Sequence, residues 1–268
     1  MDLCSNSKPK DFISKASEGR VYDYKLSVII EEEAVKKLKK ANLNLCLVKS
    51  VMSSGPVGDL LPTIWVSTPD FDKKNVFTWK HEVEGYLTDS KRNENIIPSS
   101  SYPLPLGKTL EISGDGDKKL AQVKVTGVFN SNAVTLRNRS NSDVAIGLLQ
   151  RIAVNGRDLG MIPITVQTLK EKSCRLVYPI EQVLVTFVPS TVETGSIVME
   201  TNEYPGMTVI FEFDQDEKEI IWAIRGAKDK LIEPGFWFNA NDEAWGVVIP
   251  PKFDLHYFLS NSDVDSTI

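Results

Sequence analysis

The amino-acid sequence predicts an all-β protein made of two similar β-sandwich domains in tandem, with one short helix near the N-terminus. The main observation is that residues 109–127 and 208–226 match without a gap. Both segments alternate apolar and polar residues on either side of an acidic turn, which is the pattern of a β-hairpin. The match indicates an internal duplication, and its identities are Thr109/Thr208, Asp115/Asp214, Asp117/Asp216, Lys119/Lys218 and Gly127/Gly226.

A weaker correspondence extends the duplication towards the N-terminus. Residues 43–66 resemble residues 144–166, and residues 77–83 lie over residues 176–183 with one residue inserted. Each copy therefore covers roughly 100 residues, which is the size of one β-sandwich. Two copies of that length fit tandem domains better than a solenoid, whose repeats are shorter. The expected domains are residues 21–134 and 135–259, between a loosely attached segment 1–20 and a polar tail 260–268.

Local patterns predict the individual elements in chain order. Residues 21–30 alternate and predict a strand, and residues 31–41 place glutamates before lysines, which suits the dipole of a short helix. The lysines of that helix then form a solvated face, with a lipid or nucleic-acid contact as the alternative. The other expected elements are strands beginning at Leu43 and lying around 64–66 and 77–83, a loop over 88–103, a hairpin that turns at Asn155–Gly156, and strands near 247 and 255–259.

Composition argues against several classes of protein. The chain has 268 residues, of which 41% are hydrophobic and 25% are charged, as in soluble globular proteins. A formal net charge of −5 argues against a nucleic-acid-binding protein, because such proteins usually carry a basic patch. The sequence has no apolar run long enough for a transmembrane segment, and its first residues do not form a secretory signal.

The cysteines bear on the compartment. Cys4, Cys46 and Cys174 are odd in number and far apart, which is not the pattern of a disulfide framework. With no secretory signal expected, this spacing favours a reducing, cytoplasmic location. The sequon Asn138-Arg139-Ser140 would then not meet the glycosylation machinery.

Catalytic signatures are missing from the sequence. It contains no G-x-S-x-G elbow, no H-E-x-x-H motif, no P-loop and no G-x-G-x-x-G fingerprint. Of the two histidines, His81 is expected among apolar neighbours, as a satisfied interior residue. His256 follows Asp254 on the same strand face and is the alternative candidate for a catalytic base. These observations favour a protein that is not an enzyme and needs no cofactor.

The acidic turns suggest calcium, since hard cations take oxygen ligands. However, the twelfth position of each loop, where a calcium loop has a bidentate glutamate, is Thr126 or Arg225. We therefore interpret the tips as turns, with a metal site as the weak alternative. The candidate ligands are Asp115, Asp117, Asp214 and Asp216.

One aromatic segment, residues 236–245, has no counterpart in the first copy. Flat aromatic faces mixed with amides and carboxylates are typical of sites that bind sugars or lipid headgroups. The alternative is that Phe236 and Phe238 belong to the core. The candidate binding residues are Trp237, Asn239, Asn241, Asp242 and Trp245.

The leading functional hypothesis is a non-enzymatic, lectin-like binding protein that recognises carbohydrate, lipid headgroup or a protein partner. A structural protein that self-assembles into homo-oligomers is the first alternative, because unprotected sheet edges can pair. The second alternative is a cytosolic, toxin-like defence protein that acts on membranes.

Overall fold

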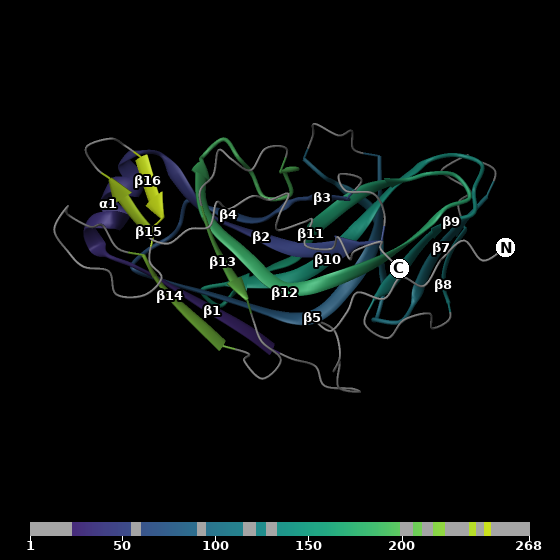
Figure 1. The fold of residues 1–268 in the computed structure, drawn as a ribbon, viewed down its shortest axis with the longest axis horizontal. Helices are drawn as coiled ribbons and strands as arrows, with labels where there is room; N and C mark the ends of the chain where they lie inside the picture. The colour runs from purple at the N-terminus through teal and green to yellow at the C-terminus, as the bar shows by residue number, and fades with distance from the viewer. Residues whose placement is uncertain are drawn as a thin grey trace, which may run out of the picture.

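A computed structural model shows two packed β-sheets and, in the residues that it describes, one helix (Figure 1). The all-β class predicted from the sequence is therefore confirmed. The structure describes residues 23–54, 60–89, 95–114, 122–126, 133–198, 206–210, 217–222, 236–239 and 244–247.

The elements are β1 (Asp23–Ile30), α1 (Glu32–Lys40), β2 (Leu43–Ser53), β3 (Leu60–Pro62), β4 (Ile64–Thr68), β5 (Lys74–Thr88), β6 (Pro98–Pro103), β7 (Thr109–Ser113), β8 (Gln122–Thr126), β9 (Val134–Asn138), β10 (Val144–Val154), β11 (Arg157–Leu169), β12 (Cys174–Pro189), β13 (Gly206–Ile210), β14 (Glu217–Trp222), β15 (Phe236–Asn239) and β16 (Ala244–Val247). Within the described ranges, the larger sheet has nine strands in the order β16-β15-β14-β1-β5-β10-β11-β3, with β6 paired to β5. The smaller sheet has seven strands in the order β4-β2-β12-β9-β7-β8, with β13 paired to β12.

The main core lies between the two sheets and follows from the alternation in the sequence. In β2, alternate residues Leu45, Leu47 and Val51 belong to this core, whereas Cys46 and Val48 belong to a second cluster. That second cluster includes Val198 and is packed against Val192, so the segment after β12 contributes to it. The central strand β2 is therefore buried on both faces, which explains its nearly continuous apolar sequence.

Two local predictions are confirmed. Glu32 and Glu33 lie in the first turn of α1 and Lys37, Lys39 and Lys40 lie in its last turn, as the helix dipole favours. Asn155 and Gly156 have φ values of 51° and 80° and join β10 to β11 in a two-residue turn. Positive φ at both positions is what a type I′ hairpin turn requires.

The segment that contains β3 and β4 crosses from the larger sheet to the smaller sheet. Strand β3 pairs with β11 in the larger sheet, and β4, which begins two residues later, pairs with β2 in the smaller sheet. Thr63, between them, forms a bridge with Ile197. The expected loop over 88–103 is wrong in part, because residues 98–103 form β6 and pair with the end of β5.

The structure does not confirm two separate sandwiches in tandem. Strand β5, from the expected first domain, pairs with β10 from the second, and β2 pairs with β12 in the same way. The two expected domains thus contribute strands to both sheets. The repeated hairpin is also wrong in its second copy: β7 and β8 form a hairpin, but β13 pairs with β12 in the smaller sheet and β14 pairs with β1 in the larger one.

Ten of the strand pairings nevertheless match when the two halves of the chain are exchanged, whereas β3–β11, β7–β8, β14–β15 and β15–β16 have no counterpart among the described strands. When each strand of one half is replaced by its counterpart in the other half, five pairings become five other observed pairings. Each pairing and its counterpart are both parallel or both antiparallel. The antiparallel pairs are β1–β5 and β9–β12, β2–β12 and β10–β5, β2–β4 and β10–β11, and β5–β6 and β12–β13. The parallel pairs are β7–β9 and β14–β1.

The residue registers of these pairings agree as well. Lys49 pairs with Val183 as Gln150 pairs with Val83, so positions 49 and 150 are equivalent, and so are 183 and 83. Register shifts recur at equivalent places, between Leu47 and Val48 in β2 and between Leu148 and Leu149 in β10.

Gly147 in β10 gives a test of the packing in the larger sheet. A Cβ atom there would lie 2.0 Å from the carbonyl oxygen of Thr165 and 2.6 Å from Cε1 of Tyr86. Because a backbone atom cannot move aside cheaply, we expect Gly147→Ala to lower the free energy of unfolding by about 3 kcal/mol. Urea denaturation would measure this loss. Gly156→Ala is the comparison, because open space surrounds it and only its positive φ opposes a side chain, at about 1–2 kcal/mol. An unchanged midpoint for Gly147→Ala would contradict the packing described.

Candidate functional site at the centre of the sandwich

Two equivalent β-bulges bring charged residues together. In β5, Val83 pairs with Gln150 and Trp79 with Ile152, so residues 80–82 lie opposite the single residue 151. In β12, Val183 pairs with Lys49 and Pro179 with Val51, so residues 180–182 lie opposite residue 50. A bulge re-aims the side chain at its centre. The two central residues, His81 and Glu181, contact each other through Nδ1 and Oε1.

Glu181 accepts from three side chains. Lys49 Nζ forms an ion pair with Oε2, and the indole Nε1 of Trp79 donates to the same oxygen at 2.9 Å. His81 contacts the other oxygen, Oε1. The carboxylate therefore joins β2, β5 and β12, which belong to both sheets.

Aromatic rings surround the Lys49 ammonium. Its Nζ lies 5.2 Å from the ring centroid of Trp79, 5.7 Å from that of Trp65 and 5.9 Å from that of Tyr24. Tyr24 stacks on Trp79 and Trp65 meets Trp79 edge-on, with centroids 5.6 Å and 5.4 Å apart. Cation–π attraction is strongest where water is excluded, and the Lys49 side chain is 0% exposed.

Burial and charge act in opposite directions on the two ionised groups. Burial lowers the pKa of Lys49, while the charge and hydrogen bond of Glu181 raise it, and the net shift is downward. For Glu181, burial raises the pKa, but the Lys49 charge and then the bond to His81 outweigh burial and lower the pKa to about 2. Glu181 therefore stays ionised at neutral pH.

Solvent reaches the cluster mainly through the histidine. The side chains of Lys49 and Glu181 are 0% and 10% exposed, whereas that of His81 is 23% exposed. Because a carboxylate only accepts hydrogen bonds, His81 Nδ1 carries the proton in this contact. Among the residues that the structure describes, no group of three or more His, Cys, Asp or Glu side chains is placed to hold a metal ion.

The sequence prediction for His81 was an interior residue with apolar neighbours. The histidine is half-buried, and its bonded partner is Glu181. Lys49 and Glu181 were not selected from the sequence. The signal was present, since Lys49 occupies an inward position between Leu47 and Val51 in an apolar strand, and Glu181 is a lone acid in a long apolar run.

The predicted aromatic site is only partly described. Trp237 and Asn239 lie in β15 and Trp245 lies in β16, while Asn241 and Asp242 lie outside the described residues. Position 237 pairs with 246, and position 238 pairs with 245. Directly paired positions share a face, so the register places positions 237 and 245 on opposite faces of the hairpin.

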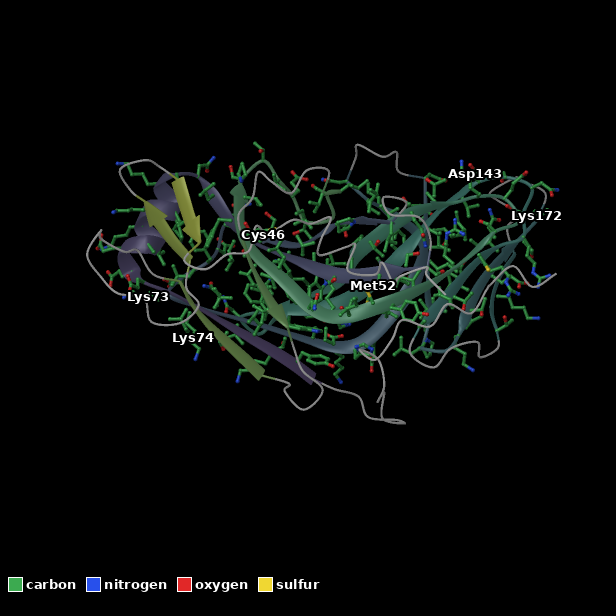
Figure 2. All side chains as sticks on the ribbon, viewed as in Figure 1. Cys46, Met52, Lys73, Lys74, Asp143 and Lys172 are labelled. Carbon is green, nitrogen blue, oxygen red and sulfur yellow. The ribbon has the colours of Figure 1, made fainter. Side chains whose placement is uncertain are left out.

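The remaining sequence candidates cannot be placed. Asp115, Asp117, Asp214 and Asp216, the calcium alternative, lie outside the described residues, as does His256. In the described part of the chain, no helix is long and apolar enough to cross a membrane. The ion pairs Lys73–Glu32 and Lys170–Asp143 are exposed, and Lys73 and Asp143 lie at opposite ends of the view in Figure 2.

The cysteines differ from the sequence expectation. Cys174, at the start of β12, is disulfide-bonded, whereas Cys46 is a free thiol whose pKa is raised by burial. The expectation of no disulfide is therefore wrong for Cys174, and the cysteine argument for a reducing compartment is lost. The sequon residue Asn138 is buried, and its amide donates to the carbonyls of Ser142, Leu169 and Lys170.

Comparison with protein-family models, with curated proteins and with solved structures finds no match to this chain. The site is therefore interpreted from its own residues.

The buried ion pair between Lys49 and Glu181 predicts how single and double substitutions change the free energy of unfolding. Glu181→Ala leaves the Lys49 ammonium buried without its partner, and we expect the free energy of unfolding to fall by about 3–5 kcal/mol. Replacing Lys49 by methionine in the same chain removes the stranded charge and keeps most of the volume. The double variant should therefore be more stable than Glu181→Ala alone. Urea unfolding of the wild type, both single variants and the double variant gives the coupling energy. Additive losses would show that the pair is not coupled.

Proposed function

We propose that the chain is a non-enzymatic binding protein that contacts its ligand through the hairpin β15–β16. The observation that carries this proposal is the position of the hairpin, which among the described strands ends the larger sheet in the order β16-β15-β14-β1. Among the described strands, a terminal hairpin offers a face and an edge to a partner, whereas the side chains of Lys49 and Glu181 in the central cluster are 0% and 10% exposed. The proposal takes carbohydrate as the ligand class, because indole faces with amides suit sugar rings and hydroxyls.

The register of the hairpin selects which residues would bind. Positions 237 and 239 are two apart in β15 and lie on one face, whereas 236 and 238 lie on the other face together with 245. In the sequence, positions 237 and 239 are tryptophan and asparagine, and positions 236, 238 and 245 are phenylalanine, phenylalanine and tryptophan. We therefore assign ligand contact to Trp237 and Asn239, and packing to Phe238 and Trp245.

Single substitutions test this assignment. We expect Trp237→Ala to weaken glycan binding at least about tenfold, which corresponds to about 1.4 kcal/mol of lost stacking. Trp245→Ala is the matched control, because the same side chain is removed from the opposite face. A glycan array and a flotation assay with phosphatidylcholine and phosphatidylserine vesicles would both be used, so that a sugar is distinguished from a lipid headgroup. Equal binding by the wild type and Trp237→Ala would remove the hairpin from consideration.

We also propose that the two halves arose by duplication and fold as one interlocked sandwich. The five equivalent strand pairings and the matching register shifts support this form of the duplication. It differs from the tandem form in that neither half completes a sheet alone. Self-assembly, action on membranes and a cytoplasmic location stay predictions.

A cut between the halves distinguishes the two forms. A protease site inserted between residues 126 and 133 would be cleaved after folding, and a reductant would then open the disulfide of Cys174. The Lys49→Arg variant would be used, so that no bond between residues 49 and 181 can hold the fragments together. We expect the two fragments to co-elute in gel filtration without denaturant, because β2, β5, β10 and β12 pair across the cut. Two tandem domains would instead separate. The uncleaved protein with the same insertion is the control.

A further inference from the structure

Lys49 and Glu181 have a geometry that suits more than an ion pair. They come from β2 and β12, which are adjacent antiparallel strands of the smaller sheet, and their charged groups are in contact. Both are largely shielded from water, and the surrounding rings come from Trp79, Trp65 and Tyr24. An amine and a carboxyl group held in contact react as an intramolecular pair, at effective concentrations far above those in solution.

We propose that Lys49 and Glu181 condense to an intramolecular amide that crosslinks β2 to β12. The bond that forms joins Lys49 Nζ to Glu181 Cδ, and the bond that breaks joins Cδ to Oε2. The ammonium supplies two protons to Oε2, which leaves as water, and Nζ keeps one hydrogen. Atoms and charge balance, since an ammonium and a carboxylate give an amide and one water. No oxidant, reductant or other reactant is needed.

The neighbouring donors suit this condensation. His81 holds Oε1, which stays as the amide oxygen, and can stabilise the negative charge that develops on it when the amine adds. Trp79 donates to Oε2, the oxygen that departs. Burial lowers the pKa of Lys49 and so favours the neutral amine that attacks. The proton that the amine loses is passed within the contact itself to the ionised Glu181, so no solvent is required.

Exclusion of water also favours the product. The reverse reaction is hydrolysis, which needs a water molecule at Cδ, and the cluster opens to solvent mainly at His81. The condensation is a single event in the life of each molecule, so a slow step is sufficient. Its product would tie the first half of the chain to the second at the point where the two bulges meet.

The difference between the halves restricts the reaction to one pair. Gln150 is equivalent to Lys49 and His81 is equivalent to Glu181, so the second copy of the arrangement has neither the amine nor the carboxyl group. Trp79 and Trp65 correspond to Pro179 and Ile164, which cannot cage a cation. Only one crosslink per chain is expected.

Intact-mass spectrometry of the full chain tests the proposal. The protein would be purified in native form, then reduced to open the disulfide of Cys174 and denatured. We expect the mass to fall below that of the sequence by one water molecule. Digestion should give a branched peptide that contains residues 49 and 181, with no tryptic cleavage after Lys49. A wild-type mass equal to that of the sequence would overturn the proposal and leave an ion pair only.

Lys49→Arg is the matched control. Arginine keeps the cation beside Glu181 but its guanidinium does not form the amide, so the full mass is expected. A variant that still lacks one water would place the modification elsewhere and also overturn the proposal. Should the variant not fold, the wild-type mass and the branched peptide decide alone. This result is independent of ligand binding by the hairpin, since the two involve different residues.

Discussion

The constraint on which the sandwich depends is that a lysine ammonium in a core must have a fixed anionic partner. Leaving a buried charge unpaired costs several kcal/mol, so the arrangement around Lys49 is not free to vary. It requires the bulge in β12 that aims Glu181 inward, the bulge in β5 that brings His81 to the same carboxylate, and the indole of Trp79 as a further donor. These requirements fix the relative position of the two sheets at their centre.

The same centre lies between the two halves of the chain. His81 and Glu181 occupy equivalent positions in the strand registers and contact each other. The strand registers of the two halves are equivalent, but the side chains differ. Lys49 forms an ion pair with Glu181, whereas the residue at the equivalent position is Gln150. Two identical charged residues at these contacting positions would repel each other, whereas a histidine and a glutamate can form a hydrogen bond.

The sequence was sufficient for what depends on local pattern. The alternation in β1 and β2, the charge order in α1 and the Asn155–Gly156 turn each predicted the observed element, because period and turn chemistry act over a few residues. It was insufficient for what depends on pairing between distant strands. The gapless match of residues 109–127 with 208–226 suggested equivalent hairpins, but the pairings make β7 equivalent to β14 and β6 equivalent to β13. Lys49 and Glu181 were missed for the same reason, since each is unremarkable until β2 and β12 are adjacent.

The interlocked pairing also bears on how the chain reaches its native state during synthesis. When the ribosome has released β2 and β5, their central partners β12 and β10 have not yet been made. Each of these two long strands then has one hydrogen-bonding edge without its native partner, which favours aggregation. Pairings between segments so far apart along the chain also form slowly. Nascent-chain folding of this protein is thus expected to be completed only late, after β12 has left the exit tunnel.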